Sequence, residues 1–156
     1  MNTKLSALAF AAVLALALGF GAVFARGLRL RDLRKEPANA VALRRLFQAD
    51  NAWGIAALLW IVTGLLRVFG RLEKESDFYL RNGFFWVKMG LFALVFVLEI
   101  RPMMTFMAWR KARARGKDPV AGTDLSSLVA LNNAEVVLVV LIPFVAALMA
   151  RGAWLF

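Results

Sequence analysis

The chain lacks two residue types that most metal and haem proteins use. None of its 156 residues is cysteine or histidine. The missing cysteine excludes disulfide bonds, iron–sulfur clusters and thiol nucleophiles. The missing histidine removes the usual haem ligand and the commonest metal ligand and general base. We therefore expect no metal, haem or other cofactor.

Acidic residues are also scarce, with 10 Asp and Glu against 20 Lys and Arg and a net charge of +10. In a soluble protein such an excess would indicate nucleic-acid binding. Here 62% of the residues are hydrophobic, and the basic residues lie mainly between long apolar stretches. That distribution is typical of membrane proteins. The sequence thus favours a bilayer and its anionic lipids as partners, and not nucleic acid.

Four apolar stretches are each long enough to cross a bilayer, which needs about 20 mostly apolar residues. They predict helices over about residues 5–25, 50–69, 84–107 and 128–150. Together they predict one all-α domain over residues 1–156, an integral membrane antiparallel four-helix bundle. The first stretch resembles a signal peptide, but its apolar run is too long for a signal core and basic residues follow it. We expect it to be retained as a helix.

Loop charge predicts the orientation. Residues 26–48 hold seven Lys or Arg, and residues 108–127 hold a second basic run. In residues 70–83 the basic and acidic residues balance. Loops rich in Lys and Arg stay on the cytoplasmic side. The sequence therefore predicts a bacterial inner-membrane protein with loops 26–48 and 108–127 in the cytoplasm, and with loop 70–83 and both termini in the periplasm.

Small residues recur every four positions along the first predicted helix, at Ala7, Ala11, Ala15 and Gly19. Such a stripe lies on one helix face and lets two backbones approach closely. Two alternatives remain open for this face. It packs against the second or fourth helix of the same chain, or it forms the interface of a homo-oligomer.

Ionisable residues inside apolar helices are costly, commonly about 3 kcal/mol at mid-span, and they mark candidate sites. Counting the helical rise places Glu99 and Glu135 at similar depth near the cytoplasmic edge. Asn132 lies one turn before Glu135, and Asp50 opens the second helix at nearby depth. In this predicted cluster, Arg101 is the central cation. We expect it to bind Glu135 or Asp50 from a neighbouring helix.

This inner polar cluster has two interpretations. Three carboxyl groups against one guanidinium leave its charges unbalanced, which indicates a proton-relay or cation site. The alternative is a hydrogen-bonded cluster that only fixes the register of the helices.

A second, basic layer is expected at the outer ends of the helices. Its members are Arg67, Lys88 and Arg151, with Tyr79, Asn82 and Trp86 beside them. Long basic side chains at this depth can simply reach the headgroups. The alternative is an anion site for a lipid headgroup, a quinone oxygen or a carboxylate.

Apolar, aromatic and basic residues follow one another in a distinctive order through much of the chain. They are Gly64 to Phe69, Phe78 to Leu80, Asn82, Phe85, Trp86, Lys88, Leu91, Phe92, Pro102, Phe106, Trp109, Arg110, Ile142, Pro143 and Ala146 to Gly152. In this order the chain resembles an uncharacterised family of small bacterial membrane proteins, domain of unknown function 2214. The resemblance implies a four-helix inner-membrane fold and no particular reaction.

A more distant resemblance begins at Lys88, which follows an aromatic pair at the start of the third predicted helix. The architecture is similar to the copper-resistance-D-like and protoporphyrinogen-oxidase-like membrane bundles. Those families use intramembrane histidines, which this chain lacks. Haem binding and porphyrin oxidation are therefore not expected.

The sequence leaves three functional hypotheses open. The first is a proton-coupled transport protein, or an ion- or lipid-binding protein, that uses the inner carboxyl cluster. The second is an accessory or structural subunit of a larger membrane complex. A membrane redox enzyme ranks below both, because the chain has no histidine or cysteine and no recognisable nucleophile arrangement.

Overall fold

The structure is a computed structural model that describes residues 3–69 and 83–151. Its described residues form four helices and no strand: α1 (Thr3–Lys35), α2 (Ala40–Phe69), α4 (Gly83–Ala114) and α5 (Leu125–Ala150). All four are long and apolar enough to cross a membrane. The predicted all-α membrane bundle is therefore confirmed.

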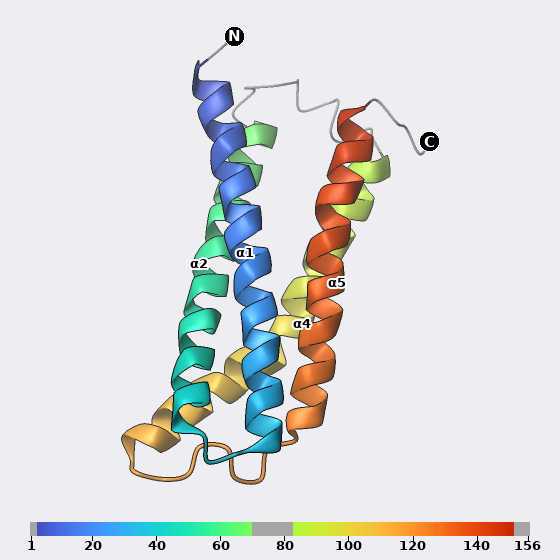
Figure 1. The fold of residues 1–156 in the computed structure, drawn as a ribbon. Helices are drawn as coiled ribbons and strands as arrows, with labels where there is room; N and C mark the ends of the chain where they lie inside the picture. The colour runs from blue at the N-terminus through green and yellow to red at the C-terminus, as the bar shows by residue number, and fades with distance from the viewer. Residues whose placement is uncertain (1–2, 70–82, 152–156) are drawn as a thin grey trace.

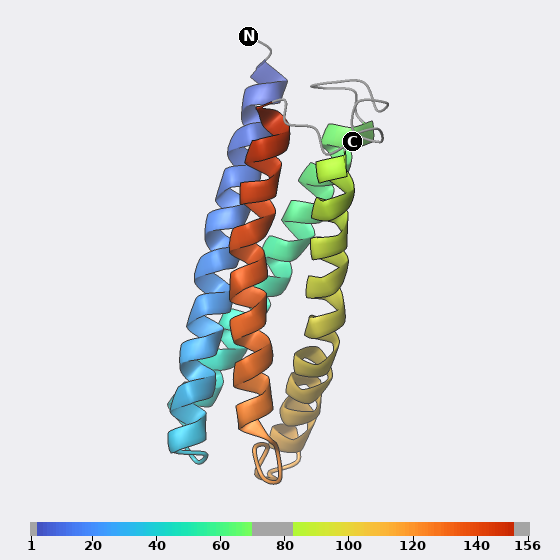
Figure 2. The ribbon, with the colours of Figure 1, turned by 90° about the vertical axis from the view of Figure 1, so that its right-hand side faces the viewer.

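The helices run up and down along one axis (Figures 1 and 2). α1 packs against both α2 and α5, and α4 packs against α5. α4 crosses behind α1 and reaches the foot of α2 in Figure 1. The α1–α2 and α4–α5 connections lie at one end, and the start of α1 and the end of α5 lie at the other.

The end that holds the two connections is rich in cations and is called the basic end below. Its basic residues are Arg29, Arg31, Arg34, Lys35, Arg44, Arg45, Arg110, Lys111, Arg113, Arg115 and Lys117. The positive-inside rule predicts that this end lies in the cytoplasm.

At the basic end the helices extend far beyond the predicted spans. Of residues 26–48, only 36–39 lie outside α1 and α2, and of residues 108–127 only 115–124 lie outside α4 and α5. The prediction of long loops here was wrong. It followed hydropathy, which falls after residue 25, whereas the helical spacing of apolar residues continues.

Leu30 and Leu33 show this continued spacing on α1, since both side chains are fully buried. On α2, Leu43 and Leu46 are buried in the same way. An apolar stripe at helical spacing stabilises a helix by packing even when its other faces are charged. The segment around Leu43 and Leu46 is therefore part of the core.

The described residues form two apolar core clusters. The basic-end cluster comprises Leu30, Leu33, Ala42, Leu43, Leu46, Phe106, Trp109, Val120, Leu125, Leu128 and Val129. The membrane cluster comprises Ala22, Val23, Trp53, Val95, Leu138, Val139 and Ile142. Along every helix, a polar residue separates the members of one cluster from those of the other.

The separating residues meet in one layer, called the Arg26 cluster below: Arg26, Asp50, Glu99, Asn132 and Glu135. Large apolar side chains on the surface gather mainly beside the membrane cluster. Examples are Phe10, Val13, Leu18, Ile55, Leu58, Phe96, Val97, Val137, Val140 and Phe144. The Arg26 cluster therefore lies near the level where the lipid-facing surface gives way to the charged surface.

The small-residue stripe of α1 is partly used inside the chain. Ala15 and Gly19 are buried, and a Cβ on Gly19 would lie 3.4 Å from both the Ala56 Cβ and the Trp53 ring. This half of the stripe is an intrachain contact with α2. Ala11 is exposed, and so is Ala7. A homo-oligomer through the stripe remains a prediction.

The two-cluster core predicts different costs for two phenylalanines. Phe106 is 1% exposed in the basic-end cluster, whereas Phe144 is 61% exposed on α5. Phe106→Ala should lower the free energy of unfolding by about 3–5 kcal/mol, because it leaves a cavity. Phe144→Ala should change it by about 0.5 kcal/mol or less. Unfolding in detergent micelles measures both, and equal destabilisation would contradict this division of the core.

Candidate functional site

Arg26 lies at the centre of the bundle, on the inward face of α1, and its side chain is fully buried. Gly19, Val23, Arg26, Leu30 and Leu33 follow one another at helical spacing and are all buried. The packing of the apolar members thus turns the arginine into the bundle. A buried guanidinium requires hydrogen-bonded partners, because its desolvation is otherwise very costly.

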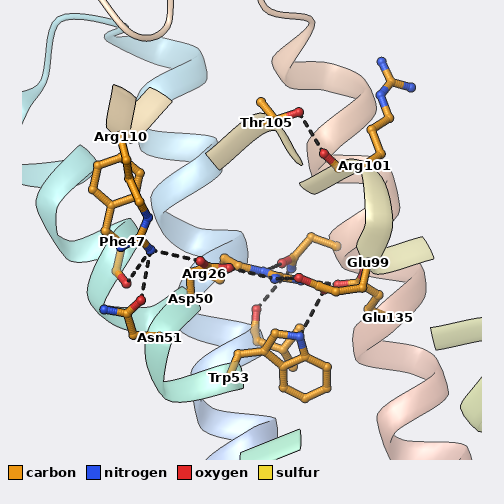
Figure 3. A network of polar contacts seen from close by, with 12 residues as sticks. Arg26, Phe47, Asp50, Asn51, Trp53, Glu99, Arg101, Thr105, Arg110 and Glu135 are labelled. Atoms are coloured by element: carbon orange, nitrogen blue, oxygen red, sulfur yellow. Dashed lines mark hydrogen bonds and ion pairs between the residues drawn. The ribbon is translucent and has the colours of Figure 1, made fainter. Parts of the chain in front are cut away.

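Arg26 reaches each of the other described helices with its five N–H donors (Figure 3). Nε donates to Asn132 Oδ1 at 2.8 Å. Nη1 donates to Glu99 Oε1 at 2.8 Å and, more weakly, to Asp50 Oδ1 at 3.4 Å. Nη2 donates to Glu99 Oε2 at 3.0 Å and to Glu135 Oε2. One side chain therefore connects α1 with α2, α4 and α5.

A second arginine binds the far side of Asp50. Arg110 Nη2 donates to Asp50 Oδ2 at 3.1 Å and to Asn51 Oδ1 at 3.0 Å. Its guanidinium carbon lies 4.5 Å from the centre of the Phe47 ring, within the range of a cation–π contact. Asp50 thus bridges two arginines and connects α2, about three turns after its start, to the last turns of α4.

Neutral donors complete the cluster. Trp53 Nε1 donates to Glu99 Oε2 at 3.0 Å, and Asn132 Nδ2 donates to the Val23 carbonyl at 3.1 Å. The aromatic rings of Trp53 and Phe106 each lie 5.9 Å from the Arg26 guanidinium carbon. The Arg26 guanidinium therefore lies near one aromatic ring from each apolar cluster.

The charges of this assembly do not cancel when every group is ionised. Asp50, Glu99 and Glu135 supply three carboxylates, whereas Arg26 and Arg110 supply two guanidinium groups. Glu135 is fully buried, and its Oε1 has no hydrogen-bond partner among the described residues. The assembly therefore has one excess negative charge and one free, buried oxygen at which it can take up a positive charge.

The described residues do not form a group of carboxylates arranged to hold a metal ion. The carboxylates of the Arg26 cluster instead surround a guanidinium, which occupies the place a metal would need. Among cations that fit a single free carboxylate oxygen in so tight a space, a proton is the simplest.

The structure brings together four of the five residues predicted for the inner cluster. Glu99, Glu135 and Asp50 bind Arg26 directly, and Asn132 joins them through Arg26 Nε. Their shared depth follows from the helical rise, which the sequence already specifies.

The fifth residue, Arg101, does not belong to the cluster, and its predicted pairing with Glu135 or Asp50 was wrong. Its side chain is exposed and points away from Arg26 (Figure 3), and its backbone carbonyl accepts a hydrogen bond from Thr105 Oγ1 at 2.8 Å. Two residues along a helix correspond to a rotation of about 200°. Because Glu99 faces the interior, Arg101 faces outward.

Arg26 was not predicted as the central cation, because hydropathy placed it in a loop. Hydropathy marks Arg26 as the first charged residue after the apolar run. The overlooked signal was periodicity, since Arg26 occupies the same face as Val23 and Leu30. Arg110 and Trp53 were also missed as partners of Asp50 and Glu99.

The outer basic layer remains a prediction. Tyr79, Asn82 and the side chain of Arg67 lie outside the described residues. Arg151 is exposed at the end of α5, Trp86 is 59% exposed, and Lys88 is half-buried on the first turns of α4. These positions are compatible with headgroup contacts by all three.

Comparison with known proteins agrees with this architecture. The family model described as a predicted membrane protein, DUF2214, matches residues 5–153. The chain therefore belongs to this family of predicted membrane proteins, as its residue pattern indicated. No curated protein and no solved structure matches the chain.

The contacts of the Arg26 cluster predict that an alanine substitution lowers the free energy of unfolding much more at Arg26 than at Arg101. Arg26→Ala leaves three carboxylates without their common partner and should cost about 3–5 kcal/mol of unfolding free energy. Arg26→Lys should recover only part of this, because an ammonium group cannot make the bidentate contact with Glu99. Unfolding in detergent micelles, or the yield of folded protein in membranes, measures the effect.

Arg101→Ala is the matched control, since it removes an exposed arginine two residues from Glu99. It should change the unfolding free energy by about 0.5 kcal/mol or less. The assignment of Arg26 as the central cation fails if the two alanine variants are equally stable.

Proposed function

We propose that this membrane protein is proton-coupled, and that the Arg26 cluster binds one exchangeable proton on Glu135. The observation that supports this is the buried Oε1 of Glu135, which has no hydrogen-bond partner among the described residues, within an assembly of three carboxylates and two guanidinium groups. A proton on this oxygen would cancel the excess charge without any further rearrangement.

A proton can reach Glu135 through its neighbours. The side chains of Asp50 and Glu99 are 18% and 20% exposed, whereas that of Glu135 is not exposed. Glu99 Oε2 and Glu135 Oε2 accept from the same nitrogen, Arg26 Nη2. Glu99 therefore serves as the entry carboxylate, and Glu135 is the inner acceptor.

Toward the other end of the bundle, the interior next to Glu135 is apolar. The membrane cluster fills the interior beyond Glu135 with apolar side chains such as Val23, Val139 and Ile142. Exchange through Asp50 and Glu99 therefore takes place at the level of the basic end. Transfer of the proton across the membrane, or its coupling to a solute, requires a second arrangement of the helices.

Arg26 provides a physical basis for such coupling. The same guanidinium binds Glu135 on α5 and Glu99 on α4. Neutralising Glu135 weakens its charge-assisted bond to Arg26, which is stronger than a bond to a neutral acceptor. The contact between α1 and α5 thus becomes weaker when the proton is bound.

Infrared spectroscopy of Glu135→Gln tests proton binding directly. Wild-type protein should show the C=O stretch of a protonated carboxyl group, with an intensity that changes with pH. Glu135→Gln should lose this band, because its amide cannot exchange a proton in this way. Glu36→Gln changes an exposed carboxylate between α1 and α2 and should keep the band.

Reconstituted vesicles test the coupling. With an imposed potential and an internal pH dye, wild-type protein and Glu36→Gln should carry a proton flux that Glu135→Gln lacks. A protein that shows no titrating carboxyl band and equal flux in all three variants would leave the Arg26 cluster as a structural clamp, which is the role expected of an accessory subunit.

A further inference from the structure

A groove of about 240 Å³ lies between α1 and α5, on the outer surface of the bundle. Its lining residues are Phe24, Gly27, Arg31, Asn132, Asn133, Val136 and Val137. Glu135, the proton-binding residue proposed above, does not line this groove.

The groove changes from apolar to polar along its length. On α1 it runs from Phe24 to Arg31, a rise of about 10 Å toward the basic end. On the antiparallel α5 it runs from Val137 to Asn133 in the same direction. Both helices therefore place their apolar residues toward the membrane cluster and their polar residues toward the basic end.

The apolar part of the groove is open to lipid. Phe24 is 48% exposed and Val137 is 57% exposed, and Val136 is half-buried between them and the core. An acyl chain can lie along these side chains and replace contacts with bulk lipid.

The floor of the groove lies where α1 and α5 approach closely, at Gly27 and Asn132. Gly27 has no side chain, and a Cβ built there would lie 2.5 Å from Asn132 Nδ2. Asn132 cannot move aside easily, because it is bonded to both Arg26 and the Val23 carbonyl. The floor is therefore rigid, and its shape does not depend on an occupant.

The polar part of the groove carries a positive charge. Arg31 is exposed and donates from Nη2 to Asn133 Oδ1 at 2.9 Å. Within the described parts of the chain, no carboxylate lies at ion-pair distance from Arg31, whereas the neighbouring Arg29 is paired with Asp32 at 2.9 Å. The Asn133 contact orients the guanidinium over the groove and leaves most of its donors available.

We infer that the α1–α5 groove binds an anionic phospholipid of the leaflet at the basic end. Arg31 and Asn133 bind the phosphate group, and the acyl chain lies against Phe24, Val136 and Val137. A guanidinium is well suited to this ligand because its donors match phosphate oxygens in pairs. An exposed cation at the level where the apolar surface ends also lies at the depth of the headgroups.

Native mass spectrometry of the full chain tests this inference, with phosphatidylglycerol as the anionic lipid and phosphatidylcholine as the zwitterionic one. The wild-type protein should retain more phosphatidylglycerol than phosphatidylcholine. Arg31→Ala should weaken that binding about fivefold, the effect of one interfacial cation. Arg34→Ala, one turn further along α1 and outside the groove, should bind as the wild type does.

A second pair of variants tests the apolar part without a change of charge. Val137→Trp fills the groove and should reduce phosphatidylglycerol retention, whereas Val140→Trp changes a similarly exposed valine that does not line the groove and should have no effect. Neither substitution disturbs the core, since both side chains are exposed.

Glycerol phosphate is a competitor that carries the phosphate group without acyl chains. It should not displace the lipid at equal concentration. Retention that is insensitive to Arg31→Ala and Val137→Trp, equal retention of the two lipids, or displacement by glycerol phosphate would each overturn the assignment.

Discussion

The structure depends on one buried guanidinium. Arg26 uses its five N–H donors on partners from three other helices, and its side chain is fully buried. Burial of an ion pair is costly, and good geometry with full hydrogen bonding offsets that cost. The bidentate contact with Glu99 and the contact with Glu135 supply this geometry. A single side chain thus connects all four described helices at one level of the bundle.

The Arg26 cluster also separates two physical environments. In lipid, apolar side chains gain no hydrophobic free energy by meeting one another, so the membrane cluster is held by close packing, as between Gly19 and Trp53. At the basic end the surface is charged, and Phe106 and Trp109 are buried by the ordinary hydrophobic effect. The Arg26 cluster lies between the lipid-facing part of the bundle and the charged basic end. A buried charge is less costly there than at mid-membrane.

Asn132 connects the Arg26 cluster with the α1–α5 groove. Its carbonyl oxygen accepts from Arg26, and its amide nitrogen lies against Gly27 at the floor of the groove. The two proposed sites thus share one rigid side chain while they face opposite sides of the α1–α5 contact. A change in the spacing of these two helices would act on both sites. Asn132 therefore links the charged interior of the bundle to the groove on its outer surface.

By itself, the sequence determined the class of fold and the depth of the carboxylates. Both are local properties, because hydropathy marks a span and the helical rise converts residue number into depth. The tertiary structure alone decided which cation meets Glu99 and Glu135. That choice depends on the rotation of each helix about its axis, and rotation is set by packing against neighbours. Packing turned Arg26 inward with Val23 and Leu30, and it left Arg101 on the outer face of α4.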